Sequence, residues 1–123
     1  MAIDYTDAFL TIAAKDLEKA IAFYQTLLDQ TPQPYIPNVY AEFQLKSLRL
    51  AIFKPKKDHE AEFNNSPGSG MSICIEVADL KAAIQHLVDI GCPPSEEITV
   101  ASHGKEIYAY DPMHNRLILH QSK

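Results

Sequence analysis

Two arginines are the side chains of this sequence best suited to holding an anion. Arg49 and Arg116 are the only arginines in the chain, and each opens a short apolar run, RLAIF and RLILH. A guanidinium is planar and permanently charged, and it donates paired hydrogen bonds to a carboxylate or phosphate. We therefore predict an anion-binding role for both arginines. The alternative is that each lies at a rim and pairs with Glu42, Glu76 or Glu106.

A histidine and a glutamate offer a second kind of chemistry. His120 lies in the last apolar run, and Glu76 lies in the run SICIEV. Imidazole and carboxylate groups are common ligands of divalent metal ions. Glu42 or Glu106 could approach as a third ligand, whereas the position of His103 in a turn predicts a side chain in solvent. Two donors do not complete a metal site, so a metal site at this place is retained only as an alternative.

An internal repeat indicates which elements position these side chains. Residues 9–28 align with residues 72–91 at an offset of 63, with an Asp-Leu pair at the same place in both copies. The runs Arg49–Phe53 and Arg116–His120 also align, at an offset of 67. Each copy has the pattern of a strand, an aspartate that caps an amphipathic helix, and further strands. The repeat therefore predicts two similar βαβββ modules.

The whole sequence, residues 1–123, is predicted to form a single domain. Module 1 covers about residues 1–55, residues 56–70 form a polar lid or linker, and module 2 covers about residues 71–123. Helices are predicted at residues 17–29 and 79–90, and strands at residues 8–14, 38–45, 48–54, 71–77, 97–101, 106–111 and 116–121, with a short strand near 35–36.

Composition excludes several classes of protein. The chain is 46 % apolar and 22 % charged with a net charge of −5, which is typical of a soluble globular domain and argues against nucleic-acid binding. We expect no secretory signal, because the first residues lack a basic region and an apolar core, and no membrane span, because the sequence has no run of about 18 apolar residues. Cys74 and Cys92 fit neither a disulfide framework nor metal-ligand spacing. We expect two reduced thiols and a cytoplasmic protein.

Two motifs resemble those of a known family. The first is the strand followed by Asp16-Leu17 and a helix containing Phe23-Tyr24, and the second is the turn Tyr110-Asp111-Pro112-x-x-Asn115 before the last strand. Together they resemble the vicinal oxygen chelate superfamily of glyoxalases, extradiol dioxygenases, fosfomycin-resistance proteins and bleomycin-resistance proteins. The resemblance covers essentially the whole chain. It implies an α+β fold in which two βαβββ modules form a curled, cup-like mixed sheet with the helices outside. It also implies a homodimer.

The period-two alternation of the strands divides their residues between two faces. The apolar set, which includes Leu50, Ile52, Leu117 and Leu119, should cover the helices, and the mixed set should line the cup. The predicted ligand-binding residues of the cup are Phe9, Thr11, Arg49, Phe53, Ser72, Cys74, Glu76, Arg116, Ile118 and His120.

Metal-dependent members of the superfamily hold a divalent ion in the cup with His, Glu or Gln. The resemblance places these ligands at Phe9, Ala51, Ser72 and Ile118 of this sequence. A phenyl ring, two aliphatic side chains and a neutral hydroxyl are not ligands for that chemistry. We therefore predict no cofactor and no catalytic residue at these positions.

The sequence favours a metal-free module that binds a small organic ligand, anionic or aromatic, and leaves enzymatic activity undecided. One alternative is a metal-dependent lyase or dioxygenase with a displaced site that uses His120 and Glu76. Another is a regulatory or partner-binding protein whose cup is closed by Phe9, Phe53 and Ile118.

Overall fold

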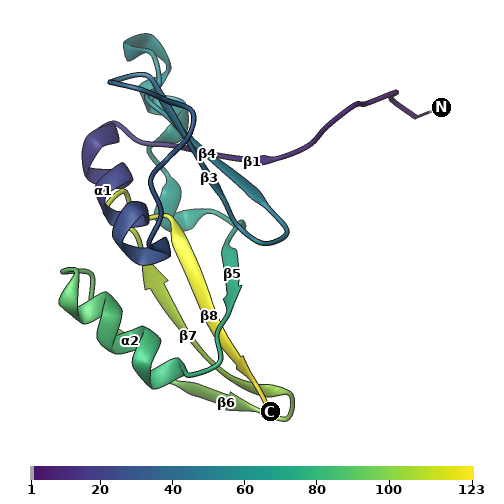
Figure 1. Cartoon of the computed structure of the whole chain (residues 1–123), viewed down its shortest axis with the longest axis vertical. Coiled ribbons are helices and arrows are strands. Elements are labelled where there is room, and N and C mark those ends of the chain that lie inside the picture. Colours follow the sequence, from purple (N-terminus) through teal and green to yellow (C-terminus); the bar gives the residue numbers. More distant parts are fainter. Residues whose placement is uncertain (1) are drawn as a thin grey trace.

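Two copies of one βαβββ unit follow each other along the chain in the computed structural model, which describes residues 2–123 (Figure 1). Module 1 consists of β1 (Leu10–Ala13), α1 (Leu17–Leu28), β2 (Tyr35–Ile36), β3 (Tyr40–Gln44) and β4 (Arg49–Phe53). Module 2 consists of β5 (Ile73–Glu76), α2 (Leu80–Asp89), β6 (Thr99–Ala101), β7 (Gly104–Tyr110) and β8 (Arg116–Ser122). Two short 3₁₀ helices, η1 (Lys57–Phe63) and η2 (Ser66–Gly68), connect the modules.

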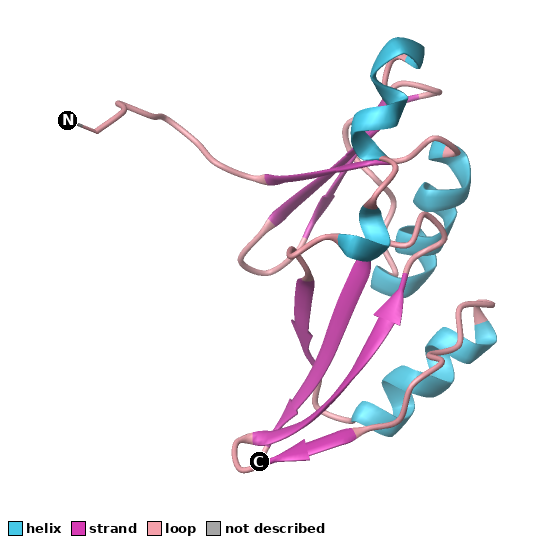
Figure 2. Cartoon of the chain, turned by 180° about the vertical axis from the view of Figure 1, so that it is seen from behind, coloured by secondary structure: helices cyan, strands magenta, loops and turns pink. Residues whose placement is uncertain are grey.

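Each module contains one four-stranded mixed sheet, and the two sheets have the same topology. The strand orders are β1-β4-β3-β2 and β5-β8-β7-β6, with the first pair of each sheet parallel and the others antiparallel. Helices α1 and α2 lie on the same side of the two sheets (Figures 1 and 2). The predicted α+β fold and its duplicated unit are therefore confirmed.

Both helices begin and end where the sequence predicts, within a residue or two. The carboxylate of Asp16 accepts a hydrogen bond from the backbone N–H of Lys19 (3.2 Å), and Asp79 accepts one from Ala82 (3.1 Å). These bonds satisfy N–H groups that have no partner inside the helix. Helix α2 is followed by Gly91, whose φ of 88° is a left-handed conformation that favours glycine.

The hydrophobic core lies between the helices and the sheets. The predicted helix-facing residues Leu50, Ile52, Leu117 and Leu119 are all buried there. They meet Leu17, Ala20, Ile21 and Tyr24 of α1 and Leu80 and Leu87 of α2 within one continuous cluster. The division of the strands into two faces is therefore confirmed for β4 and β8. None of the helices in the described part of the chain has the length and apolar character needed to cross a membrane.

A buried hydrogen bond joins the two modules on the helix side. The hydroxyl of Tyr24 in α1 donates to Oδ2 of Asp111, in the turn before β8, over 2.6 Å. The other oxygen of Asp111 accepts from the backbone N–H groups of Met113 (2.8 Å) and Asn115 (2.9 Å). Burial, and then the charge of Asp111, raise the pKa of Tyr24 well above its ordinary value, so the phenol stays protonated and remains the donor.

The connecting segment and the N-terminus occupy different places. Phe63 of η1 packs edge to face on Phe53 of β4, with ring centroids 5.3 Å apart, so η1 covers the end of that strand. The N-terminal arm, defined here as residues 2–9, extends away from the body on the side opposite the helices (Figures 1 and 2). Ile3 and Tyr5 of this arm are 84 % and 71 % exposed.

Candidate functional site

A cavity of about 280 Å³ lies between the edge strand of module 1 and the beginning of module 2. All of β1 forms one wall of the cavity, and the connecting segment covers the cavity through Phe63 and neighbouring residues. The polar lining residues are Thr11, Glu62, Asn65, Ser66, Ser69, Ser72, Asn115 and Arg116. The other lining residues are Leu10, Ile12, Ala13, Met71 and Ile73. Its size and mixed lining suit a small organic molecule.

Three of the predicted ligand-binding residues, Thr11, Ser72 and Arg116, line this cavity. Arg116 is held by three hydrogen bonds: Nε donates to Oγ of Ser72 (2.6 Å), and Nη2 donates to the carbonyl oxygens of Ser69 (2.9 Å) and Met71 (3.4 Å). Its remaining nitrogen, Nη1, meets no acceptor within residues 2–123. The guanidinium is therefore fixed in place, carries no carboxylate partner among these contacts, and retains a free donor.

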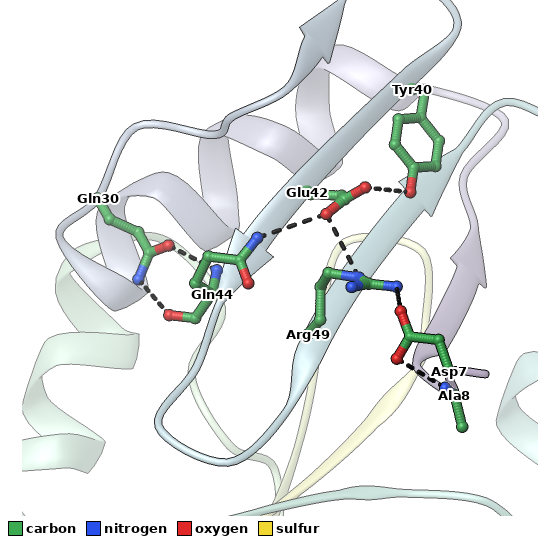
Figure 3. Close-up of polar contacts among 7 residues, drawn as sticks. All are labelled: Asp7, Ala8, Gln30, Tyr40, Glu42, Gln44 and Arg49. Atoms are coloured by element: carbon green, nitrogen blue, oxygen red, sulfur yellow. Dashed lines mark hydrogen bonds and ion pairs between the residues drawn. The ribbon is translucent and has the colours of Figure 1, made fainter.

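Arg49, the equivalent residue of module 1, is neutralised by two carboxylates (Figure 3). Nη2 donates to Oδ2 of Asp7 over 2.8 Å. Nε lies 3.4 Å from Oε1 of Glu42, an ion-pair distance without the alignment of a hydrogen bond. The hydrogen bond from Arg49 is the main cause that lowers the pKa of Asp7. The guanidinium also lies 4.0 Å from the ring centroid of Phe9. Arg49 thus anchors the N-terminal arm to β4.

The other predicted residues lie outside the cavity lining. Phe53 contacts Phe63, and Cys74 and Ile118 pair across β5 and β8. Burial raises the pKa of the Cys74 thiol, which makes it a poor nucleophile at neutral pH. The predicted residues that the cavity does not include are Phe9, Arg49, Phe53, Cys74, Glu76, Ile118 and His120.

Glu76 and His120 form a close pair near the C-terminal end of β8. Oε1 of Glu76 contacts Nδ1 of His120, and Oε2 accepts hydrogen bonds from the hydroxyl (2.8 Å) and the backbone N–H (3.2 Å) of Ser122. The bond to His120 and then the bond to the Ser122 hydroxyl lower the pKa of Glu76, so the group is a carboxylate at neutral pH.

His103, predicted to face solvent, lies beside this pair. It is exposed, but its ring stacks on that of His120 with centroids 5.1 Å apart. Glu106, considered in the sequence as a third donor, lies directly opposite His120 in the β7–β8 pairing. The repeat gives no signal for His103, because the corresponding turn of module 1, between β2 and β3, consists of Pro37, Asn38 and Val39 and contains no histidine.

Comparison with known proteins identifies the family. A model of the Glyoxalase/Bleomycin resistance protein/Dioxygenase superfamily matches residues 3–119. The chain belongs to this superfamily. A curated relative is human mitochondrial methylmalonyl-CoA epimerase, which is 31 % identical over 113 residues. The match covers 84 % of this chain but only 64 % of the length of that enzyme.

Solved structures of the superfamily share the fold at low sequence identity. A glyoxalase-related enzyme from Fulvimarina pelagi matches with a TM-score of 0.77 and 21 % identity, over 95 % of this chain and 88 % of that chain. The fosfomycin resistance protein FosX from Listeria monocytogenes matches with a TM-score of 0.75 and 17 % identity, over 98 % of this chain and 96 % of that chain.

The superfamily's metal positions do not fit a metal ion in this chain. Phe9 lies under the guanidinium of Arg49, Ala51 is fully buried, and Ile118 has no ligand atom. Ser72 supplies the one heteroatom of the four side chains, and its Oγ already accepts a hydrogen bond from the cationic Arg116. A second cation at this oxygen would be repelled by the first, so no reaction step is assigned to a metal at these four positions.

Proposed function

We propose that this protein binds a small anionic organic ligand in the cavity between β1 and β5, without a metal ion at the four superfamily positions. The observation that carries the proposal is the guanidinium of Arg116, which is fixed at the cavity wall and keeps Nη1 free. An anionic group on the ligand would accept from Nη1. The apolar side chains of β1 and the ring of Phe63 would bury the rest of the molecule.

Replacement of Arg116 by alanine is expected to weaken ligand binding by roughly tenfold to a hundredfold. A hydrogen bond to a charged group contributes about 1.5–3 kcal/mol, which corresponds to that range of Kd. The probes are benzoate, phenyl phosphate and methylmalonyl-CoA, screened first by thermal shift and then titrated by calorimetry. Arg116→Lys, which keeps the charge but loses the planar donor, should bind with intermediate affinity.

Arg49→Ala is the matched control, because Arg49 occupies the equivalent strand position but has two carboxylate neighbours. Its affinity for the same probe should stay within a factor of about three of the parent. Equal binding by the parent and Arg116→Ala would refute the assignment. If none of the probes binds to the parent, the cavity is closed to such ligands, and a regulatory or partner-binding function is favoured instead.

Epimerisation of an acyl thioester is a second candidate, favoured by the 31 % identity to methylmalonyl-CoA epimerase. This reaction removes a proton on one face of a carbon atom and returns one to the other face, which requires two positioned acid–base groups. The cavity lining contains one carboxylate, Glu62, besides the cationic Arg116. Ligand binding is therefore supported better than epimerisation by the residues present.

A homodimer is the expected assembly, with the N-terminal arm contacting the second copy. Besides Ile3 and Tyr5, the arm exposes Phe9, while Arg49 fixes its base through Asp7. Apolar side chains on a projecting segment are typical of an interface, and a stable dimer buries about 800 Å² per partner. Light scattering after size exclusion at micromolar concentration should therefore give twice the chain mass.

The double variant Ile3→Asp/Tyr5→Asp should raise the dimer dissociation constant at least tenfold, because each change places a charge in the interface. Val88→Asp is the control, since Val88 is also exposed but lies on α2 at the helix side. A parent protein that is monomeric at micromolar concentration would contradict the assembly.

Cytoplasmic location remains a prediction from the two cysteines, which are both free thiols in the fold.

A further inference from the structure

Three potential metal ligands converge at the turn between β6 and β7, beside the C-terminal half of β8 and away from the cavity. One ligand atom each from His103, Glu106 and His120 lie within 4.8 Å of one another. His120 is four residues from Arg116 along β8, so the Cα atoms of these two residues are about 13 Å apart. The cluster is also separate from the superfamily positions, since Ile118 rather than His120 occupies the corresponding place in β8.

The free nitrogen of His120 is the strongest sign that the cluster has a ligand. His120 is 9 % exposed, and its Nε2 is buried without a hydrogen-bond partner in the part of the chain that is described. Burying a polar atom without a partner is unfavourable, and such an atom usually has a water molecule or an ion beside it. A bound cation would accept the lone pair of this nitrogen.

Glu76 orients the imidazole of His120 so that Nε2 can bind a metal ion. Its carboxylate contacts Nδ1, which places the ring proton on Nδ1 and leaves the lone pair on Nε2. The two hydrogen bonds from Ser122 hold the other oxygen of Glu76 in place. A carboxylate that orients a histidine through its second nitrogen is a recurrent support of metal-bound histidines.

Gly104 lets the turn between β6 and β7 lie close to Nε2 of His120. A Cβ atom at Gly104 would lie 3.0 Å from this nitrogen, so a larger residue there would crowd it. Ligand atoms 2.0–2.1 Å from a tetrahedral ion are about 3.4 Å apart. His103 is exposed and Glu106 is partly exposed, so rotation of these two side chains can shorten the present separations around the fixed His120.

We propose that His103, Glu106 and His120 form a binding site for a divalent transition-metal ion such as Zn²⁺, with Glu76 as the positioning residue for His120. Two imidazoles and one carboxylate are a donor set that suits such ions. Three protein ligands leave the fourth position of a tetrahedral ion open to water or to a small anion. This site is independent of the cavity that contains Arg116.

Calorimetric titration of the untagged full-length chain with ZnCl₂ tests the site. We expect one Zn²⁺ per chain with micromolar or tighter affinity. Glu76→Gln should weaken binding by about 10–100-fold, the usual effect of losing such a supporting group. His103→Ala and Glu106→Gln should weaken it by at least as much, and both residues are exposed enough to be replaced without loss of the fold.

The visible absorption of bound Co²⁺ distinguishes the metal ligands from the positioning residue Glu76. At saturating Co²⁺, Glu76→Gln should retain the intense visible absorption of a tetrahedral complex, because all three ligands remain. His103→Ala should lose it. Circular dichroism and the unfolding midpoint in EDTA should match the parent for both variants.

Exposed histidines outside the cluster supply the controls. His59→Ala and His114→Ala should bind Zn²⁺ like the parent, since neither residue belongs to the cluster. Lack of saturable binding by the parent would overturn the proposal. So would undiminished binding by both His103→Ala and Glu106→Gln, which would instead place the ion elsewhere, including the four superfamily positions. In each case the result for Arg116 and its ligand is unaffected.

Discussion

Replacing Asp111 by alanine is expected to lower the free energy of unfolding by about 3–5 kcal/mol. Asp111 is 2 % exposed, and its carboxylate accepts four hydrogen bonds. The donors are the hydroxyl of Tyr24, the backbone N–H groups of Met113 and Asn115, and the side-chain amide of Asn115 (2.9 Å). Alanine leaves these donors without a partner, and each buried donor that loses its acceptor costs about 1–3 kcal/mol.

Tyr24→Phe is the matched variant, because it removes one of the four hydrogen bonds and keeps the packing of the ring. It should lower the free energy of unfolding by about 1–1.5 kcal/mol. Both variants are compared by urea denaturation, followed by circular dichroism and by tyrosine fluorescence. Since the Tyr24–Asp111 bond joins the modules, we expect one cooperative transition for the parent. Equal stability of Asp111→Ala and the parent would show that the turn is held by other contacts.

Gly104→Ala is expected to lower the free energy of unfolding by about 2–4 kcal/mol, through backbone strain and a direct clash. Gly104 has a φ of 150°, and a Cβ there would lie 2.3 Å from the backbone oxygen of Gln121. That oxygen belongs to β8 and cannot move without disturbing the β7–β8 pairing. Thermal and urea denaturation measure the loss.

Alanine substitutions at two other glycines provide a comparison for the loss of stability expected from Gly104→Ala. A Cβ at Gly91 would meet nothing within 4 Å, but its φ of 88° is unfavourable for alanine, so Gly91→Ala should cost about 1 kcal/mol. A Cβ at Gly70 also has open space, and no unfavourable φ applies there. Gly70→Ala should therefore be neutral or slightly stabilising. If Gly104→Ala is no worse than Gly91→Ala, strand β8 shifts more easily than its pairing indicates.

Local pattern in the sequence was sufficient to determine the two α-helices, the order of the strands and the duplicated fold, but it did not predict the 3₁₀ helices η1 and η2 in the connecting segment. The caps at Asp16 and Asp79 predicted the helix starts, and alternation predicted that Leu50 and Leu117 would be buried. These features depend on residues a few positions apart, because capping, helical period and strand alternation are local properties of the backbone. The turn motif at Asp111, together with the helix start at Asp16-Leu17, also resembled the superfamily to which the chain belongs.

Which side chains of these elements contact each other is decided by the tertiary structure alone. Arg49 and Arg116 are equivalent in the repeat, yet Arg49 meets Asp7 and Glu42 whereas Arg116 lies at the cavity. The difference comes in part from the N-terminal arm, which supplies Asp7, and from the connecting segment, which supplies Ser69 to Arg116. It also comes from the repeated strands themselves, because Tyr108 of β7 corresponds to Glu42 of β3.

The stacking of His103 on His120 and the bond from Tyr24 to Asp111 also have no local signature. In the latter pair the partners are 87 residues apart. Such contacts depend on how complete modules and turns pack against each other. The free energy of that packing is shared among many side chains, so no spacing of residues in the sequence encodes it.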